Sequence, residues 1–163
     1  MSTTTVAPRT GRDLLTDREF AAVTATVRGN NPGMREPLAQ RIVSQGAAFV
    51  GAAAVTEHTI SPSRTVDEGW HALILHTRIY QRLCDRAGRF VHHVPQAPDS
   101  GRFDTAWRDR AMDAIRAAGF EVDEELWRPP GDRTVDVAAQ CQHRPPTCDD
   151  APCEAQDCDA SPN

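Results

Sequence analysis

The sequence predicts an all-α fold, a small four-helix bundle-like domain with a disordered C-terminal tail, and three observations favour it. Apolar residues recur at helical spacing in four segments, and no alternating stretch is long enough for a sheet. Capping and stop signals bound these segments. The last 35 residues contain no Leu, Ile, Phe, Trp, Tyr or Met, so they bury too little apolar surface to offset their ordering entropy. We therefore predict a flexible arm over residues 1–12, a helical domain over residues 13–128 and a disordered, acidic, Cys- and Pro-rich tail over residues 129–163.

Capping signals and small residues define the first two helices. Thr16-Asp17-Arg18-Glu19 is a capping box that begins a helix running to about Val27. A second helix starts near Pro37, a residue suited to a first turn, and ends before Ser61-Pro62-Ser63. Residues 46–54 of this helix are mostly Ala and Gly, which lets a neighbouring backbone approach closely. The second helix is therefore the predicted centre of the domain.

The remaining elements follow from stop signals and apolar spacing. A third helix is predicted from about Thr65 to Ala87, with Gly88 as its C-terminal stop, and an extended connection follows over residues 90–95. A fourth helix spans about residues 103–118, and residues 120–127 form a short packed segment with one helical turn. The predicted core face of the third helix is a single stripe, made of Val66, Trp70, Leu73, Thr77, Tyr80, Cys84 and Ala87.

Charge and composition exclude several classes of partner. Of the 163 residues, those up to 128 carry 16 Arg against 16 acidic residues, so the formal net charge of −5 belongs to the tail. Nucleic acids and anionic membranes need a basic surface, so neither is a predicted partner, whereas a protein partner stays open. The N-terminus lacks the apolar core of a signal peptide, and no run is long enough to span a membrane, which predicts a cytoplasmic protein. All 18 basic residues are Arg, a bias typical of a GC-rich bacterial genome.

A cluster of histidines and carboxylates is the main candidate site, since five of the six histidines lie within 36 residues. Asp67 and His71 are four apart on one helix face, and Glu68 and His71 have the spacing of carboxylate-bridged di-iron bundles. The chain lacks the second Glu-x-x-His of a di-iron site, and Thr65 to Glu68 also fits a capping box. His58, just before this helix, is placed to approach Asp67 and His71. Imidazole and carboxylate together favour a divalent transition metal, zinc or iron.

Chain reach indicates which histidines share a site. His71 and His76 are about 140° apart around the predicted helix, on opposite sides of the core stripe. The connection spans at most about 20 Å, so His92 or His93 is expected to reach His76 or Tyr80 more easily than His71. The predicted metal ligands are His71, His93, His92, Asp67 and His76, with Glu68, Trp70, Tyr80 and His58 as supporting residues.

Several of these positions recur in a known family. The chain resembles the glycine-rich domain-containing protein family through Val66-Asp67-Glu68-Gly69-Trp70-His71, Tyr80, Cys84, Gly88 and His92-His93-Val94-Pro95. The likeness covers residues 35–95 well and is closest to short bacterial members that lack the glycine-rich part. Plant members carry Trp-His-x-His, where this chain has Leu73 in place of the second histidine. The resemblance implies a helical fold and candidate residues rather than a reaction.

The tail contains four of the five cysteines. Cys148, Cys153 and Cys158 are five residues apart, and Cys141-Gln142-His143 precedes them. Thiolates and an imidazole are zinc ligands, although no Cys-x-x-Cys pair is present to begin such a site. Three interpretations stay open: a soft-metal site, a redox-active or modified segment, and an acidic extension with incidental thiols. Because the tail has no large apolar residue, its removal is expected to leave the fold intact.

Two main functions are compatible with these patterns. The first is a small bacterial metal-binding protein with a His and carboxylate site on the third helix, and with the Cys-rich tail as a second metal site or as the sole one. The alternative is a non-catalytic structural or interaction module with a buried His, Tyr and Trp network and an incidental tail. Phosphate-binding loops, nucleophile elbows and paired catalytic carboxylates are missing, which argues against NTPase, hydrolase-fold and glycosidase activity. These patterns do not decide whether the protein is an enzyme.

Overall fold

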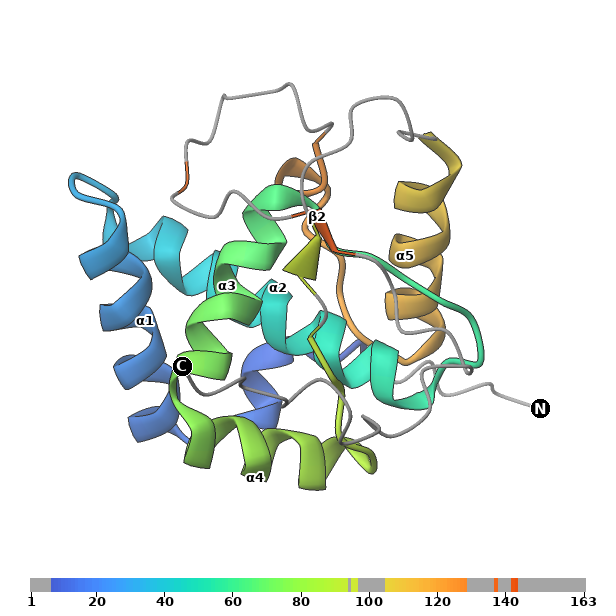
Figure 1. Ribbon diagram of the computed structural model, residues 1–163, viewed down its shortest axis with the longest axis horizontal. Coiled ribbons are helices and arrows are strands. Elements are labelled where there is room, and N and C mark those ends of the chain that lie inside the picture. The colour runs from blue at the N-terminus through green and yellow to red at the C-terminus, as the bar shows by residue number, and fades with distance from the viewer. Residues whose placement is uncertain (1–6, 94, 97–104, 129–136, 138–141, 144–163) are drawn as a thin grey trace, which may run out of the picture.

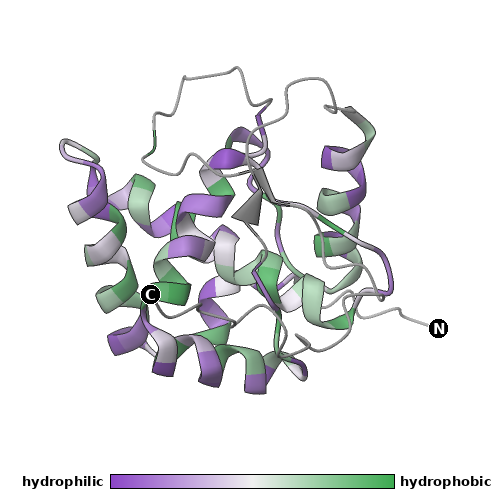
Figure 2. Cartoon of the chain, viewed as in Figure 1, coloured by the Kyte–Doolittle hydropathy of each residue, from purple (hydrophilic) through white to green (hydrophobic). Residues whose placement is uncertain are grey.

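The computed structural model is all-α, as predicted, with one helix at the centre of the others. It describes residues 7–93, 95–96, 105–128, 137 and 142–143. The helix α2 (Glu36–Val55) contacts every other helix of the described chain (Figure 1). Buried apolar residues of α2 and of the helices around it form one core cluster, and hydrophobic and hydrophilic residues alternate along the ribbons of these helices (Figure 2). The surrounding helices are α1 (Asp17–Asn30), α3 (Arg64–Leu75), α4 (Thr77–Ala87) and α5 (Thr105–Ala117), with the short 3-10 helices η1 (Gly11–Leu14) and η3 (Glu124–Leu126).

Local capping chemistry sets several helix ends where the sequence predicts them. At the start of α1, the Thr16 hydroxyl accepts from the Glu19 amide at 3.3 Å, and the Glu19 carboxylate accepts from the Thr16 amide at 2.9 Å. The predicted capping box is therefore confirmed. Gly88 and Gly119 follow α4 and α5 with φ of 99° and 83°, a left-handed conformation that favours glycine.

The backbones of α2 and α3 are in direct contact at two glycines. A Cβ atom on Gly69 would lie 2.3 Å from the Ile42 carbonyl oxygen, and one on Gly46 would lie 2.8 Å from the Gly69 carbonyl carbon. Neither position has room for a methyl group, because the obstructing atoms are main chain. The prediction that the small residues of the second helix allow close backbone approach is confirmed.

The predicted third helix is two helices, because the chain breaks at His76. His76 has φ −94° and ψ 67°, ends α3 and precedes α4. Its Nε2 atom lies 2.7 Å from the Thr26 hydroxyl on α1, a contact between residues far apart in sequence. No Gly or Pro lies at this break, so the spacing of apolar residues alone predicts one continuous helix. Within that stripe Thr77 is exposed and Ala87 half-buried, whereas Val66, Trp70, Leu73, Tyr80 and Cys84 are buried as predicted.

A buried carboxylate attaches α4 to the start of α1. Glu19 accepts hydrogen bonds from Arg82 at 2.7 Å and from Arg86 at 2.9 Å. Burial alone would raise the pKa of Glu19, but the hydrogen bonds from Arg86, the Thr16 amide and Arg82 outweigh it and lower the pKa to about 2. The carboxylate therefore stays ionised and serves both the local cap and the contact between the two helices.

The residues before α1 are held more firmly than the sequence predicts. The Arg9 amide donates to the Gly119 carbonyl and the Arg9 carbonyl accepts from the Glu121 amide, both at 2.8 Å. Gly11 is buried against the backbone of Ser44 on α2. The predicted flexible arm over residues 1–12 therefore does not hold for residues 9–12, because their backbone groups pair with distant partners that local sequence does not reveal.

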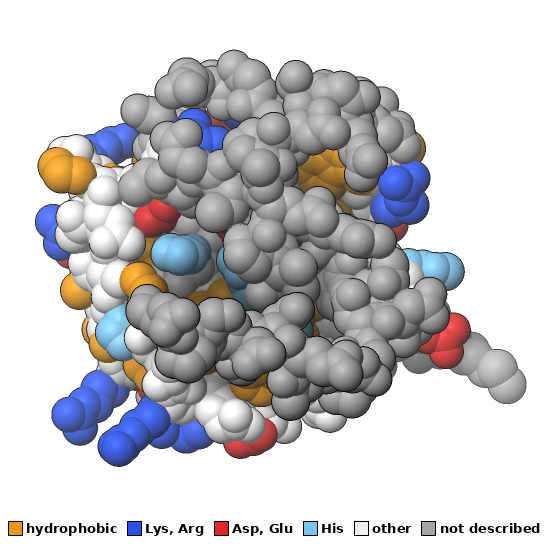
Figure 3. Space-filling model, viewed as in Figure 1, with side chains coloured by type: hydrophobic (Ala, Val, Ile, Leu, Met, Phe, Trp, Pro, Cys, Tyr) orange, Lys and Arg blue, Asp and Glu red, His pale blue; other side chains and the backbone are white. Residues whose placement is uncertain are grey.

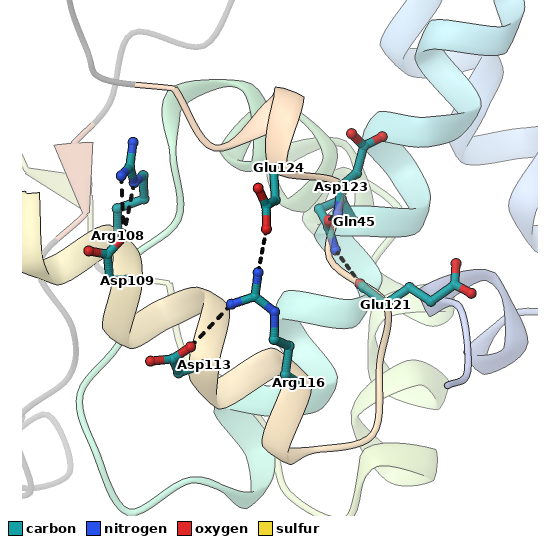
Figure 4. A network of polar contacts seen from close by, with 8 residues as sticks. All are labelled: Gln45, Arg108, Asp109, Asp113, Arg116, Glu121, Asp123 and Glu124. Atoms are coloured by element: carbon teal, nitrogen blue, oxygen red, sulfur yellow. Dashed lines mark hydrogen bonds and ion pairs between the residues drawn. The ribbon is translucent and has the colours of Figure 1, made fainter. Parts of the chain in front are cut away.

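Polar contacts fasten the segment that follows α5. Both ends of the buried Gln45 amide are used, since its nitrogen donates to the Glu121 carbonyl and its oxygen accepts from the Asp123 amide (Figure 4). Arg116 on α5 donates to Glu124 at 2.6 Å. The predicted packed segment with one helical turn is confirmed, with Leu126 and Trp127 fully buried.

Three described residues of the tail contact the domain. Val137 is buried, and its carbonyl accepts a hydrogen bond from Arg64 at the start of α3. The strand β2 (Gln142–His143) pairs antiparallel with β1 (Pro95–Gln96), with Pro95 opposite His143. The other tail residues, including the four cysteines, lie outside the described residues.

We predict that Gly69→Ala lowers the free energy of unfolding by about 1–3 kcal/mol or more, because a backbone carbonyl occupies the space of the new methyl group. Gly29→Ala is the matched control: Gly29 lies in α1 with nothing within 4 Å of its missing Cβ. The control is expected to be neutral or to stabilise by about 0.5–1 kcal/mol. Urea unfolding measures both variants, and equal stabilities would contradict the close contact.

We also predict that ending the chain after Arg128 keeps the helical signal but lowers the free energy of unfolding by about 1–3 kcal/mol. The loss combines the burial of Val137 with its hydrogen bond, partly offset by the entropy that the tail regains. A chain ending after His143 serves as the control and is expected to match the full chain. Identical thermal midpoints for all three chains would show that the tail contacts contribute nothing.

Candidate metal site

The start of α3 fixes two buried carboxylates. The Ser63 hydroxyl accepts from the Val66 amide at 3.1 Å and donates to the Leu126 carbonyl at 2.6 Å. Ser63 is therefore the N-cap, and the predicted capping box from Thr65 to Glu68 is wrong, because the helix starts two residues earlier. Asp67 and Glu68 are each 1% exposed.

Glu68 joins α3 to the end of α1. Its carboxylate accepts from the Asn31 side chain at 2.8 Å, and the same Asn31 nitrogen donates to the Val27 carbonyl at 2.7 Å. No sequence pattern singles out Asn31, because its partner Glu68 is 37 positions away. These contacts give Glu68 a part in helix packing.

Asp67 and His71 on α3 come together with His93, which lies on the connection after α4. The Nε2 atom of His93 lies 3.7 Å from Oδ1 of Asp67. The His93 ring meets Trp70 edge-on with centroids 4.7 Å apart, and its centroid is 6.2 Å from that of His71. Figure 3 shows histidine side chains on the face that carries α3. We call these three residues the α3 cluster.

A hydrogen-bonded chain brings the connection back onto α3. Trp70 Nε1 donates to the Tyr80 hydroxyl at 3.0 Å, and that hydroxyl donates to the Val91 carbonyl. Burial raises the pKa of Tyr80 well above its usual range, so the hydroxyl keeps the proton that it donates. Burial also raises the pKa of the neighbouring Cys84 thiol, which disfavours the reactive thiolate. Val91 is thus fixed two residues before His93.

The connection after α4 returns further along α3 than chain reach predicts. It does reach Tyr80, through Val91, but His93 itself lies against Asp67 and His71 rather than His76. The reason is the break at His76, which separates α3 from α4 and shortens the path that the connection must retrace.

The other predicted ligands lie elsewhere. His76 contacts Thr26 at the junction of α3 and α4. His92 is exposed and packs against Phe90, with ring centroids 4.9 Å apart. His58 is exposed on the link between α2 and α3, where its amide donates to the Thr56 hydroxyl, so it is not part of the α3 cluster.

One pair of donor atoms in the α3 cluster lies near the spacing of a metal site. In the described part of the chain, no three His, Cys, Asp or Glu side chains are already arranged to hold a metal ion. Zinc holds nitrogen and oxygen ligands at about 2.0–2.2 Å, which puts neighbouring donors about 3.4 Å apart in a tetrahedral site. The 3.7 Å between Asp67 and His93 exceeds that spacing by a few tenths of an ångström.

An open groove of about 550 Å³ lies apart from this cluster. It runs between η1, α2 and the segment after α5, and Arg41, Ser44 and Gln45 line it. Arg41 is paired with Asp123 at 2.6 Å, and the Gln45 amide is used at both ends. These polar groups hydrogen-bond to the residues that line the groove, so they do not indicate a ligand-binding site.

The Trp70–Tyr80–Val91 chain makes a testable contribution to stability. Tyr80→Phe is expected to cost about 2–4 kcal/mol, because it leaves a buried indole N–H and a buried carbonyl without this partner. Trp70→Phe removes the same donor, so the double variant is expected to lose less than the two single variants together. Strictly additive losses in urea unfolding would contradict the shared hydrogen bond.

Among the described helices, none has both the length and the apolar character that spanning a membrane requires.

The chain matches one family of known proteins. No curated protein and no solved structure matches it. Residues 14–102 match the UCP032817-like family, a span that contains α1 to α4 and the whole α3 cluster. Because this match covers more than half of the sequence, the chain belongs to the UCP032817-like family.

Proposed function

We propose that this protein binds a divalent transition metal ion, zinc or iron, through Asp67, His71 and His93. The observation that supports the proposal is the convergence of His93 with two residues one helical turn apart on α3. Two imidazoles and one carboxylate suit both zinc and non-haem iron. All three residues are among the ligands that the sequence predicts, and the position of His93 beside Asp67 supports their selection from the longer set.

The exposure of the three side chains is compatible with a bound cation. The Asp67 side chain is 1% exposed, and charges interact more strongly at a site that is shielded from water. His93 is 14% exposed and His71 is half-buried, so both imidazoles are partly accessible to solvent while the carboxylate is not. If a coordination position stays open, such an ion acts as a Lewis acid on whatever binds there.

The alternative is a structural module in which the same residues hold the connection without a metal. The Trp70–Tyr80–Val91 chain favours this alternative, because it fixes the connection through hydrogen bonds alone. The two functions differ in what the loss of His93 removes. If His93 is a metal ligand, its removal abolishes or weakens metal binding. If it is a packing residue, its removal lowers the free energy of unfolding.

We predict that the full chain, with its four tail cysteines changed to Ser and no affinity tag, binds one zinc ion in a calorimetric titration. His71→Ala and His93→Ala are each expected to weaken binding at least about tenfold, since even the hydrogen-bond partner of a ligand contributes that much. His92→Ala, an exposed neighbour, is the matched control and is expected to bind as the parent does.

Elemental analysis of the parent and circular dichroism of each variant complete this test. The helical signal is expected to persist in both ligand variants. A parent that binds no zinc or iron, together with a His93→Ala variant that is only less stable, would refute metal binding and favour the structural module.

A further inference from the structure

All three tryptophans of the chain lie on one path of contacting rings that starts at the α3 cluster. The His93 ring meets Trp70 with centroids 4.7 Å apart, and Trp70 meets Phe49 of α2 at 5.0 Å. Phe49 meets Trp127 at 6.4 Å, and Trp127 meets Trp107 of α5 at 6.4 Å as well. All four distances are within the range of direct aromatic contact. We call these five rings the aromatic path.

The aromatic path crosses the core and ends at a side chain that solvent reaches. Phe49 and Trp127 are each 1% exposed and Trp70 is 3% exposed, whereas Trp107 on α5 is half-buried. The helix that carries Phe49, α2, lies between α3 and α5 (Figure 1). The path therefore connects the candidate metal ligands on one side of α2 with the surface of α5 on the other.

The hydrogen bonding of Trp127 is not what core packing favours. Its Nε1 atom is buried, and among the described residues no group accepts a hydrogen bond from it. A buried indole N–H usually finds a partner, and leaving it without one costs stability. A phenylalanine would fill most of the same volume without that cost. An unpaired buried donor of this kind calls for a reason other than packing.

One-electron chemistry supplies such a reason. An indole that loses an electron becomes a radical cation, and its charge is trapped where a base removes the N–H proton. Trp127 has no described acceptor for that proton, and the Trp70 N–H faces the Tyr80 hydroxyl, which donates its own proton to the Val91 carbonyl and is a poor base. Only at Trp107 can water take the proton. Positive charge placed on Trp70 is therefore free to move along the aromatic path to α5.

We propose that the aromatic path carries single electrons from Trp107 to iron held by the α3 cluster, so that the iron-loaded protein reduces hydrogen peroxide with a one-electron reductant such as ascorbate. This inference rests on the proposed function and selects iron from its two metals, because zinc has no redox chemistry. Two histidines and one carboxylate are also the ligand set of non-haem iron(II) sites.

Electrons and protons balance in this reaction. Hydrogen peroxide takes up two electrons and two protons and gives two molecules of water. Iron(II) supplies one electron and becomes iron(III), and Trp70 supplies the other. Trp127 then reduces Trp70, and Trp107 reduces Trp127 and releases its N–H proton to water. One ascorbate returns an electron and a proton to Trp107, and a second ascorbate reduces iron(III) and releases its proton, so the two ascorbates supply all that the peroxide consumes.

The first test locates the radical. The full chain with its four tail cysteines changed to Ser is the parent; it is loaded with iron(II) without oxygen and mixed with hydrogen peroxide and a nitroso spin trap. Peptide mass spectrometry is expected to find the trap mainly on Trp107. Trp127→Phe, which loses no described hydrogen bond, is expected to lose most of this label and to gain label on Trp70.

Two controls accompany this measurement. Phe120→Leu changes a buried aromatic residue that is not on the aromatic path and is expected to label as the parent does. The zinc-loaded parent is expected to give no label, because zinc does not reduce peroxide. Circular dichroism and thermal unfolding confirm that each variant is folded at the temperature of the experiment.

Peroxide-dependent oxidation of ascorbate is the second readout. Trp107→Phe is expected to lose most of this rate and to bind iron(II) as the parent does, because Trp107 is remote from the α3 cluster along the path.

The outcomes separate the two proposals. Equal labelling of Trp107 in the parent and in Trp127→Phe would mean that oxidant reaches Trp107 through solvent, which overturns the aromatic path and leaves metal binding intact. Label confined to Trp70 in an iron-binding parent, or label lost equally in Phe120→Leu, would overturn it too. A parent that binds zinc but not iron also overturns the path alone, and a parent that binds neither metal refutes both proposals.

Discussion

The contact between Gly46 and Gly69 is the constraint on which the rest of the structure depends. It brings the α2 and α3 backbones together without intervening side chains, and this sets the depth of α3 in the domain. Asp67 and Trp70 lie within two residues of Gly69, so the contact also sets their burial. The cluster residues are placed by a main-chain crossing, because no side-chain repacking can substitute for the missing space.

The α3 cluster needs two further devices beyond that crossing. The break at His76 separates α3 from α4, and the Tyr80 hydroxyl ties the returning connection to Trp70. Together they carry His93 to Asp67. Each device is a polar contact between residues ten or more apart, so the cluster forms only when the helices have already packed.

Features that depend on neighbouring residues in the sequence were predictable, and features that depend on tertiary contacts were not. The capping box at Thr16 involves residues three apart, and the stops at Gly88 and Gly119 are single-residue signals, so all were predictable. The His76 side chain, at the break, contacts Thr26, which is fifty positions away, and no local pattern encodes that partner. The same holds for the site: the shared helix face of Asp67 and His71 was visible, whereas the place of His93 depended on how the chain returns.

The pairing of Arg9 with residues 119–121 has a consequence for synthesis on the ribosome. The first described residues hydrogen-bond to a segment that is translated more than a hundred residues later. These bonds form only after residue 121 has left the exit tunnel, although α1 to α4 are by then already outside. The first described residues are therefore fastened only after α1 to α4 have emerged, and a nascent chain that stalls within α5 leaves the backbone of Arg9 without these partners.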